Sequence, residues 1–229
     1  MVYNWLINSL RCLIPPRCHL CDVPGEHLCA DCQADLPRLQ HACLRCGVAL
    51  ETDTLARFCG TCLQSPPHFQ MTFSPYAYQT PVNYLITALK YQGRLSLVPV
   101  LAGVLAEHVE HCSAEMVDAL LPVPLHASKL RQRGFNQAHE LARPLARRFG
   151  LPIMHQLERC RATEAQSSLH ADERQQNVLN AFRIQQPFDY QRVAIVDDVM
   201  TTGSTVNEIA RLLSNAGVKK IQVWCVARA

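Results

Sequence analysis

The stretch that decides the fold runs from Val193 to Thr205 and reads Val-Ala-Ile-Val-Asp-Asp-Val-Met-Thr-Thr-Gly-Ser-Thr. Its four leading apolar residues, 193–196, are typical of a parallel strand that is buried on both faces. A helix is predicted over 204–216, with Gly217 as its stop, and a second apolar strand is predicted at 221–226. Strand, helix and strand in this order predict a parallel sheet with crossover helices.

Two acids and a polar turn follow the first of these strands. Asp197 and Asp198 stand at its carboxyl end, where parallel sheets bind their ligands. Adjacent carboxylates suit two vicinal hydroxyls, which donate hydrogen bonds, or a magnesium ion, which prefers oxygen ligands. The turn can cradle a phosphate because a helix N-terminus presents N–H groups and Gly203 lets the backbone approach closely. A well-capped polar turn without a ligand is the simpler interpretation. The predicted phosphate residues are Met200, Thr201, Thr202, Gly203, Ser204 and Thr205.

A segment rich in cations precedes another predicted helix. The apolar run 119–125 is broken by two prolines and indicates a short strand that ends in a loop. A helix is predicted over 135–149, with a kink at Pro144. Cations and a glycine directly before a helix can form an anion site. We therefore predict a second anion site in this basic loop, against the alternative of a solvated loop. Its residues are Lys129, Arg131, Arg133 and Gly134.

Cysteines dominate the N-terminal part of the chain. Eight of the 12 cysteines form four C-x-x-C pairs within residues 18–62. Two such pairs supply the four thiolates of one tetrahedral zinc ion, so the four pairs predict two closed, structural sites. The regular spacing favours zinc over disulfides, an iron–sulfur cluster or redox pairs. It also favours sequential ribbons, while interleaved ligation stays open. The predicted ligands are Cys18, Cys21, Cys29, Cys32, Cys43, Cys46, Cys59 and Cys62.

Several strings carry a resemblance to known families. The Asp197 loop resembles the ribose-phosphate signature of the type I phosphoribosyltransferases. The string Arg131-x-Arg133-Gly134-Phe135-Asn136-Gln137 resembles the ComF competence family of ComFC-type proteins, which pair a cysteine-rich head with a phosphoribosyltransferase-like domain. The likeness runs from about Cys18 to the C-terminus. Further matching strings are Lys90-Tyr91-Gln92-Gly93-Arg94, Arg159-x-Arg161-x-Thr163-x-x-Gln166 and Arg174-x-x-Asn177.

This resemblance implies a ligand, phosphoribosyl pyrophosphate bound with magnesium, and a role for each segment. Asp197 and Asp198 are then the catalytic pair that holds the ribose hydroxyls, residues 200–205 hold the 5-phosphate, and the basic loop holds the pyrophosphate. The polar stretch 159–176 falls where related enzymes have a mobile loop that closes over the substrate. Pyrophosphate or substrate contact is accordingly assigned to Arg159, Arg161 and Thr163, with a surface loop of mixed charge as the alternative.

The predicted fold class is an α/β, type I phosphoribosyltransferase-like parallel sheet with crossover helices, preceded by a small cysteine-rich zinc-ribbon module. We predict a double zinc-ribbon module at 1–66, a hood with connecting helices at 67–118 and the phosphoribosyltransferase-like core at 119–229. A net charge of +3 is too small for the protein to bind nucleic acid or membranes through its overall charge. Binding through local basic patches stays an open alternative.

The sequence also bears on cellular location. No apolar run approaches the ~20 residues of a transmembrane helix, and Met1–Ile14 lacks the pattern of a signal peptide. With no export signal, reduced thiolates that bind metal fit the cysteine pairs better than disulfides do. We therefore expect a cytoplasmic protein, which partner proteins could hold at the inner face of the membrane.

Three functions stay open at this point. One is an enzyme that transfers a phosphoribosyl group to an unknown small acceptor and releases pyrophosphate, although no general base for a nucleobase stands out. Another is a protein that binds phosphoribosyl pyrophosphate or a related phosphorylated ligand without turnover. The resemblance implies a third, a part in natural transformation, DNA uptake or use of external DNA. The resemblance implies a competence helicase and DNA-loading proteins as partners in that process. The alternative is a non-catalytic adaptor that binds single-stranded DNA and partner proteins.

Overall fold

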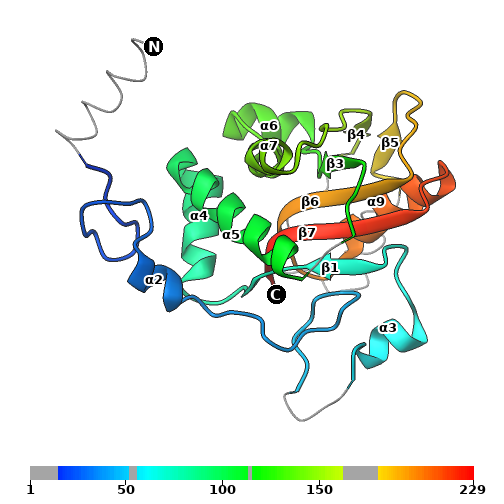
Figure 1. The fold of residues 1–229 in the computed structure, drawn as a ribbon. Helices are drawn as coiled ribbons and strands as arrows, with labels where there is room; N and C mark the ends of the chain where they lie inside the picture. The colour runs from blue at the N-terminus through cyan, green and yellow to red at the C-terminus, as the bar shows by residue number, and fades with distance from the viewer. Residues whose placement is uncertain (1–14, 52–55, 113–114, 162–179) are drawn as a thin grey trace.

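The computed structural model describes residues 15–51, 56–112, 115–161 and 180–229. Its centre is a parallel sheet with the strand order β1, β7, β6, β3 (Figure 1). The strands are β1 (Met71–Phe73), β7 (Lys220–Arg228), β6 (Arg192–Met200) and β3 (Ala119–Pro122). The short strand β2 (Tyr76–Ala77) pairs with the carboxyl end of β7, and Ile153 forms a single parallel bridge to Leu120 of β3. The predicted parallel sheet is confirmed.

The sheet separates two hydrophobic clusters, because successive side chains of a strand point to opposite faces. In β6, Ala194 and Val196 belong to one cluster while Val193 and Ile195 belong to the other. The first cluster is covered by α4 (Val82–Gln92), α5 (Val98–His111) and α7 (Gln137–Phe149). The second cluster is covered by α9 (Ser204–Asn215) and by the antiparallel pair β4 (Leu157–Arg159) and β5 (Phe182–Ile184).

Helices α4 and α7 each end at a glycine in a left-handed conformation. Gly93 ends α4 with φ 63°, and Gly150 ends α7 with φ 66°, a backbone region that glycine adopts at little cost. The 3-10 turn η1 (Leu95–Leu97) joins α4 to α5. Pro144 lies inside α7, which is helical on both sides of it. Among the described residues no helix is long and apolar enough to cross a membrane.

Two segments differ from the sequence-based expectation. The basic loop is a helix for most of its length, α6 (Ala127–Arg133), because the His126 ring accepts a hydrogen bond from Ser128 N and Gly134 ends the helix with φ 83°. The range predicted as hood and connecting helices, 67–118, also contributes strands β1 and β2 to the main sheet. The predicted strand, helix and strand after residue 192 are confirmed as β6, α9 and β7.

The cysteine-rich part forms two small units on different sides of this core (Figure 1). The first ribbon, residues 18–32, contains the start of α2 (Ala30–Ala34) and lies beside α4. The second ribbon is described over 43–51 and 56–62, contains the start of α3 (Gly60–Gln64), and lies beside β1. Each ribbon therefore has its own contact with the α/β core.

Candidate ligand site and metal centres

The predicted phosphate loop, residues 200–205, runs from the last residue of β6 to the second residue of α9. Gly203 adopts φ 79°, and Thr202 Oγ1 accepts a hydrogen bond from Ser204 N at 3.3 Å and lies 2.9 Å from Ser204 Oγ. Thr201 and Thr202 are exposed, and they lie directly before the N-terminus of α9, whose first amides have no partner within the helix. The Met200 side chain is buried in the core, which leaves only its backbone for a ligand.

The two adjacent acids do not share one face of the sheet. Asp198 is 1% exposed, and its Oδ2 lies 2.6 Å from Lys90 Nζ, which comes from the end of α4. Its Oδ1 lies 3.5 Å from Gln137 Nε2 at the start of α7. Asp197 is partly buried on the opposite side, and its Oδ1 accepts a hydrogen bond from Asp198 N. Asp198 is therefore a carboxylate on the α4 side of the sheet, and Lys90 is its counter-ion.

The charges of this group depend on one another. Burial of the carboxyl and the nearby charge of Asp198 raise the pKa of Asp197 well above its ordinary value. Burial opposes the charged form of Lys90, but the carboxylates of Asp198 and Asp197 outweigh it and raise the Lys90 pKa. The two acids and the lysine form one coupled set, in which Lys90 carries the charge that Asp198 needs inside the protein.

Cations gather around the two acids from three elements. Burial, together with the positive charges of Arg159, Arg133 and Lys90, lowers the pKa of Lys129. Lys129 and Arg133 are four residues apart on α6 and so lie on the same side of that helix. The Arg133 guanidinium stacks 5.3 Å from the centre of the Tyr91 ring and donates a hydrogen bond to Gln137 Oε1. A polyanion at this edge of the sheet would meet four cations.

The structure brings some of the predicted site residues together and leaves others apart. Arg159 ends β4; burial lowers its pKa, and the charge of Asp197 opposes that effect. Arg131 and Gly134 are exposed on α6 and at its end, and Arg161 is exposed at the edge of the described chain. Thr163 lies outside the described residues. The roles assigned to these residues stay predictions.

Sequence reasoning missed two contributors to the site, Lys90 and Gln137. Both lie in strings that carry the family resemblance, 90–94 and 131–137, which was the available signal. Neither residue type by itself indicates a contact with an acid at the end of a distant strand. The contact arises because α4 and the start of α7 pack on the same face of the sheet.

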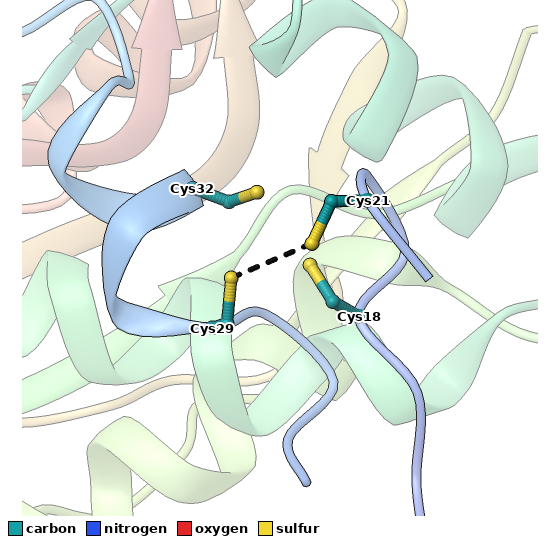
Figure 2. A group of neighbouring side chains, drawn as sticks. All are labelled: Cys18, Cys21, Cys29 and Cys32. Carbon is teal, nitrogen blue, oxygen red and sulfur yellow. Dashed lines mark hydrogen bonds between the residues drawn. The ribbon is translucent and has the colours of Figure 1, made fainter. Parts of the chain in front are cut away.

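Eight cysteines form the two expected groups of four. Figure 2 shows Cys18, Cys21, Cys29 and Cys32 with their sulfurs turned toward one another. In each group all four Sγ atoms lie within 4.8 Å of one another, and the pairs Cys21–Cys29 and Cys46–Cys59 are 3.6 Å apart. Four sulfurs around a tetrahedral zinc ion lie about 3.8 Å apart, so both groups fit zinc. The sequential pairing is confirmed, since Cys18–Cys32 supply one group and Cys43–Cys62 the other.

In each group, backbone amides favour the thiolate form of the first cysteine. Burial opposes the Cys43 thiolate, but the amides of Cys46, Cys59 and Arg45 point at its Sγ and lower its pKa to about 7. The equivalent amides lower the pKa of Cys18 to about 6 against the same opposing effect of burial. None of the described cysteines forms a disulfide. The donor set of both sites is therefore that of a closed structural zinc site, in which no position is left open for catalysis.

Comparisons with known proteins agree with this two-part organisation. A family model described as a phosphoribosyl transferase domain matches residues 135–229, and a double zinc ribbon domain matches residues 9–63. DNA utilization protein YhgH of Salmonella typhimurium is 37% identical over 224 residues, which cover 94% of this chain and 98% of that protein.

Two competence proteins are also similar. Competence protein F of Haemophilus influenzae is 37% identical over 210 residues, which cover 88% of this chain and 90% of that protein. Competence protein ComFC of Bacillus subtilis is 26% identical over 198 residues, which cover 85% and 80% respectively. The resemblance predicted from the sequence is confirmed: the chain belongs to the ComF/ComFC family of competence and DNA utilization proteins.

Proposed function

We propose that the chain binds phosphoribosyl pyrophosphate with magnesium at the carboxyl edge of its sheet and acts in DNA uptake or the use of external DNA. The observation that carries the ligand is the meeting of a helix-capping phosphate loop, two acids and four cations at one edge. A sugar that carries phosphates at two positions requires both an anion cradle and acceptors for its hydroxyls. The names of the similar proteins support the process.

The two acids have different parts in this proposal. Asp197 is partly exposed, and it accepts hydrogen bonds from the ribose hydroxyls or from water bound to magnesium. Asp198 is contacted on both oxygens, by Lys90 and Gln137, so ribose contact there requires Lys90 to move. Once displaced, the Lys90 ammonium joins Lys129, Arg133 and Arg159 as a partner for the pyrophosphate. Ligand binding thus exchanges one ion pair for another.

Calorimetric titration with phosphoribosyl pyrophosphate and magnesium tests this site. We expect micromolar binding by the zinc-loaded protein and a loss of about hundredfold or more in the Asp197→Ala, Asp198→Ala double variant, because charged hydrogen bonds to the ligand disappear. Arg148→Ala is the matched control, since Arg148 forms an exposed ion pair with Glu110 on other elements. Equal affinity of the double variant and the wild type would contradict the assignment.

Turnover is a separate question with its own assay. If the chain transfers the phosphoribosyl group to a small acceptor, pyrophosphate appears when candidate acceptors are added to the bound complex. If it acts as a sensor or adaptor, the ligand stays intact while its binding is retained. Pyrophosphate release under these conditions decides between an enzyme and a binding protein that share one site.

Single-stranded DNA is a second candidate ligand, favoured by one specific contact. Tyr91 is 74% exposed and has the Arg133 guanidinium stacked against its ring. An exposed aromatic ring beside an arginine is the combination on which unpaired bases stack. Fluorescence anisotropy with a labelled oligonucleotide should show weaker binding by Tyr91→Ala and a smaller salt dependence for Arg131→Ala or Arg133→Ala. An unaltered salt dependence would mean that the two arginines contact pyrophosphate and not DNA.

A further inference from the structure

The second ribbon docks on the core through three consecutive carbonyl groups. Leu44 O accepts a hydrogen bond from Thr72 N at 3.0 Å, Arg45 O from Thr72 Oγ1 at 2.7 Å, and Cys46 O from Arg228 Nε at 2.8 Å. These carbonyls belong to the turn that joins the ligands Cys43 and Cys46. The amides of Arg45 and Cys46 in the same turn point at Cys43 Sγ. One turn therefore faces the metal with its N–H groups and the core with its carbonyls.

Arg228 continues this contact into the phosphate loop. Its Nη1 donates to Met200 O at 3.2 Å and to Thr201 O, the carbonyls at the start of the loop. The residue is partly buried at the end of β7, beside the end of β6 in the sheet register. An arginine suits this position because its planar fork can hold two acceptors in fixed directions, which a lysine ammonium cannot do.

The fit between turn and sheet leaves little room. Gly47 has φ 70°, and a Cβ built on it would meet Thr72 Cγ2 at 3.0 Å and Arg228 Cδ at 3.7 Å. The turn thus contacts both residues that hold its carbonyls. Because the three hydrogen bonds and this packing share one short segment, a change in its shape reaches Arg228 directly.

We propose that Arg228 is a positioning residue for the phosphate loop, and that it makes the shape of this loop depend on the metal-bound state of the second ribbon. With four thiolates held by a cation, the turn 43–47 keeps its carbonyls in line and Cys46 O fixes one side of the Arg228 fork. The other side of the fork then holds the Met200 and Thr201 carbonyls. The first ribbon makes no such contact among the described residues. For the ligand of the loop the inference rests on the proposed function.

Hydrogen–deuterium exchange of the unliganded protein provides the first test. Cys29→Ser and Cys59→Ser form a matched pair, because each residue is a zinc ligand that caps a five-residue helix, α2 or α3. Elemental analysis should show that each variant has lost one of its two zinc ions. We expect Cys59→Ser to speed amide exchange in 201–205, and Cys29→Ser to leave it at the wild-type rate. Arg228→Gln and the milder Arg228→Lys should speed exchange there while both zinc ions stay bound.

Affinity is the second readout. Arg228→Gln should weaken the binding of phosphoribosyl pyrophosphate with magnesium about tenfold, the usual effect of losing hydrogen bonds that hold a site in place. Unchanged exchange of 201–205 in Arg228→Gln, or in Cys59→Ser after its zinc is lost, would overturn the coupling. If the wild type binds no phosphoribosyl pyrophosphate, the proposed function fails, whereas the exchange rates still decide the role of Arg228.

Discussion

The two zinc ribbons have the same internal construction and different attachments to the rest of the molecule. In the first, Cys18 N donates to Val23 O at 2.9 Å and Asp22 takes φ 61°; in the second, Cys43 N donates to Val48 O at 2.8 Å and Gly47 takes φ 70°. Each ribbon then continues into a five-residue helix that begins after a ligand cysteine. The repeated cysteine pairs thus specify one structural unit that is used twice.

The attachments rest on different interactions. Buried residues of the first ribbon join the main hydrophobic cluster, Leu28 among them. His19 Nδ1 lies 3.0 Å from Arg94 Nη1, and its Nε2 lies 2.9 Å from Ser96 Oγ. The second ribbon adds no residue to either hydrophobic cluster of the described chain and docks through backbone carbonyls. The difference teaches that the metal shapes both ribbons, while the docking surface decides what the loss of metal does elsewhere.

Removal of zinc should give the largest effect. A strong chelator should release two zinc ions per chain and unfold both ribbons, because structural zinc contributes about 10–16 kcal/mol to such modules. Amide hydrogen–deuterium exchange should then become faster in α4, which loses the apolar contact with the first ribbon. It should also become faster at Thr72 N, which loses its hydrogen bond to Leu44 O. The pairing of β6 with β7 should keep its protection. Elemental analysis that finds no zinc in the purified protein would refute this account.

Loss of Lys90, the counter-ion of Asp198, should give the second largest effect. Lys90→Met leaves the Asp198 carboxylate buried without its partner, which costs about 3–5 kcal/mol of the free energy of unfolding. The Lys90→Met, Asp198→Asn double variant should recover most of that loss, since no charge remains to be desolvated. Thermal unfolding of the four proteins of this cycle measures the coupling. Additive effects would show that the two side chains do not interact, and zinc content should stay the same throughout.

A pair of substitutions compares the two attachments directly. Leu28→Ala removes a buried side chain of the first ribbon and should cost about 2–4 kcal/mol, because it leaves a cavity in the main cluster. Thr72→Val removes one hydrogen bond to the second ribbon and should cost about 1 kcal/mol. Thermal unfolding measures the loss of stability in each variant, and the zinc content is the control that both variants keep their metal. A larger effect of Thr72→Val would reverse the comparison between apolar and hydrogen-bonded docking.

Local signals in the sequence predicted the centre of the fold well. The apolar run at 193–196 and the Thr-Thr-Gly-Ser turn specify strand, loop and helix by residue type alone, and the structure has them as β6, the turn 201–203 and α9. The strand is longer than predicted, because β7 pairs with β6 as far as Met200. That extension turns Asp197 and Asp198 to opposite faces, which a strand ending at 196 does not indicate.

Contacts between distant segments were beyond the reach of these signals. Lys90 meets Asp198 only because α4 docks on the sheet, and Arg228 meets Cys46 only because the second ribbon lies beside β1. The helix α6 could have been predicted from the sequence, since Gly134 after seven helical residues is an ordinary helix stop. Residue type predicts elements and metal ligands, whereas the partners of a charged side chain depend on how the elements pack.

The two faces of β6 give the smallest and most specific prediction, a pH dependence. The raised pKa of Asp197 means that folding favours its neutral form, so this group stabilises the protein below its unfolded pKa of about 3.9. That stability is lost as the pH rises through the folded pKa, and Asp197→Asn, which cannot ionise, escapes the loss. The variant should therefore gain stability relative to the wild type as the pH is raised from 5 to 8.5, measured by thermal unfolding with zinc bound. Asp198→Asn should instead destabilise, because it leaves the partly buried Lys90 without its carboxylate. An equal difference between Asp197→Asn and wild type at both pH values would mean that the Asp197 carboxyl does not titrate in this range.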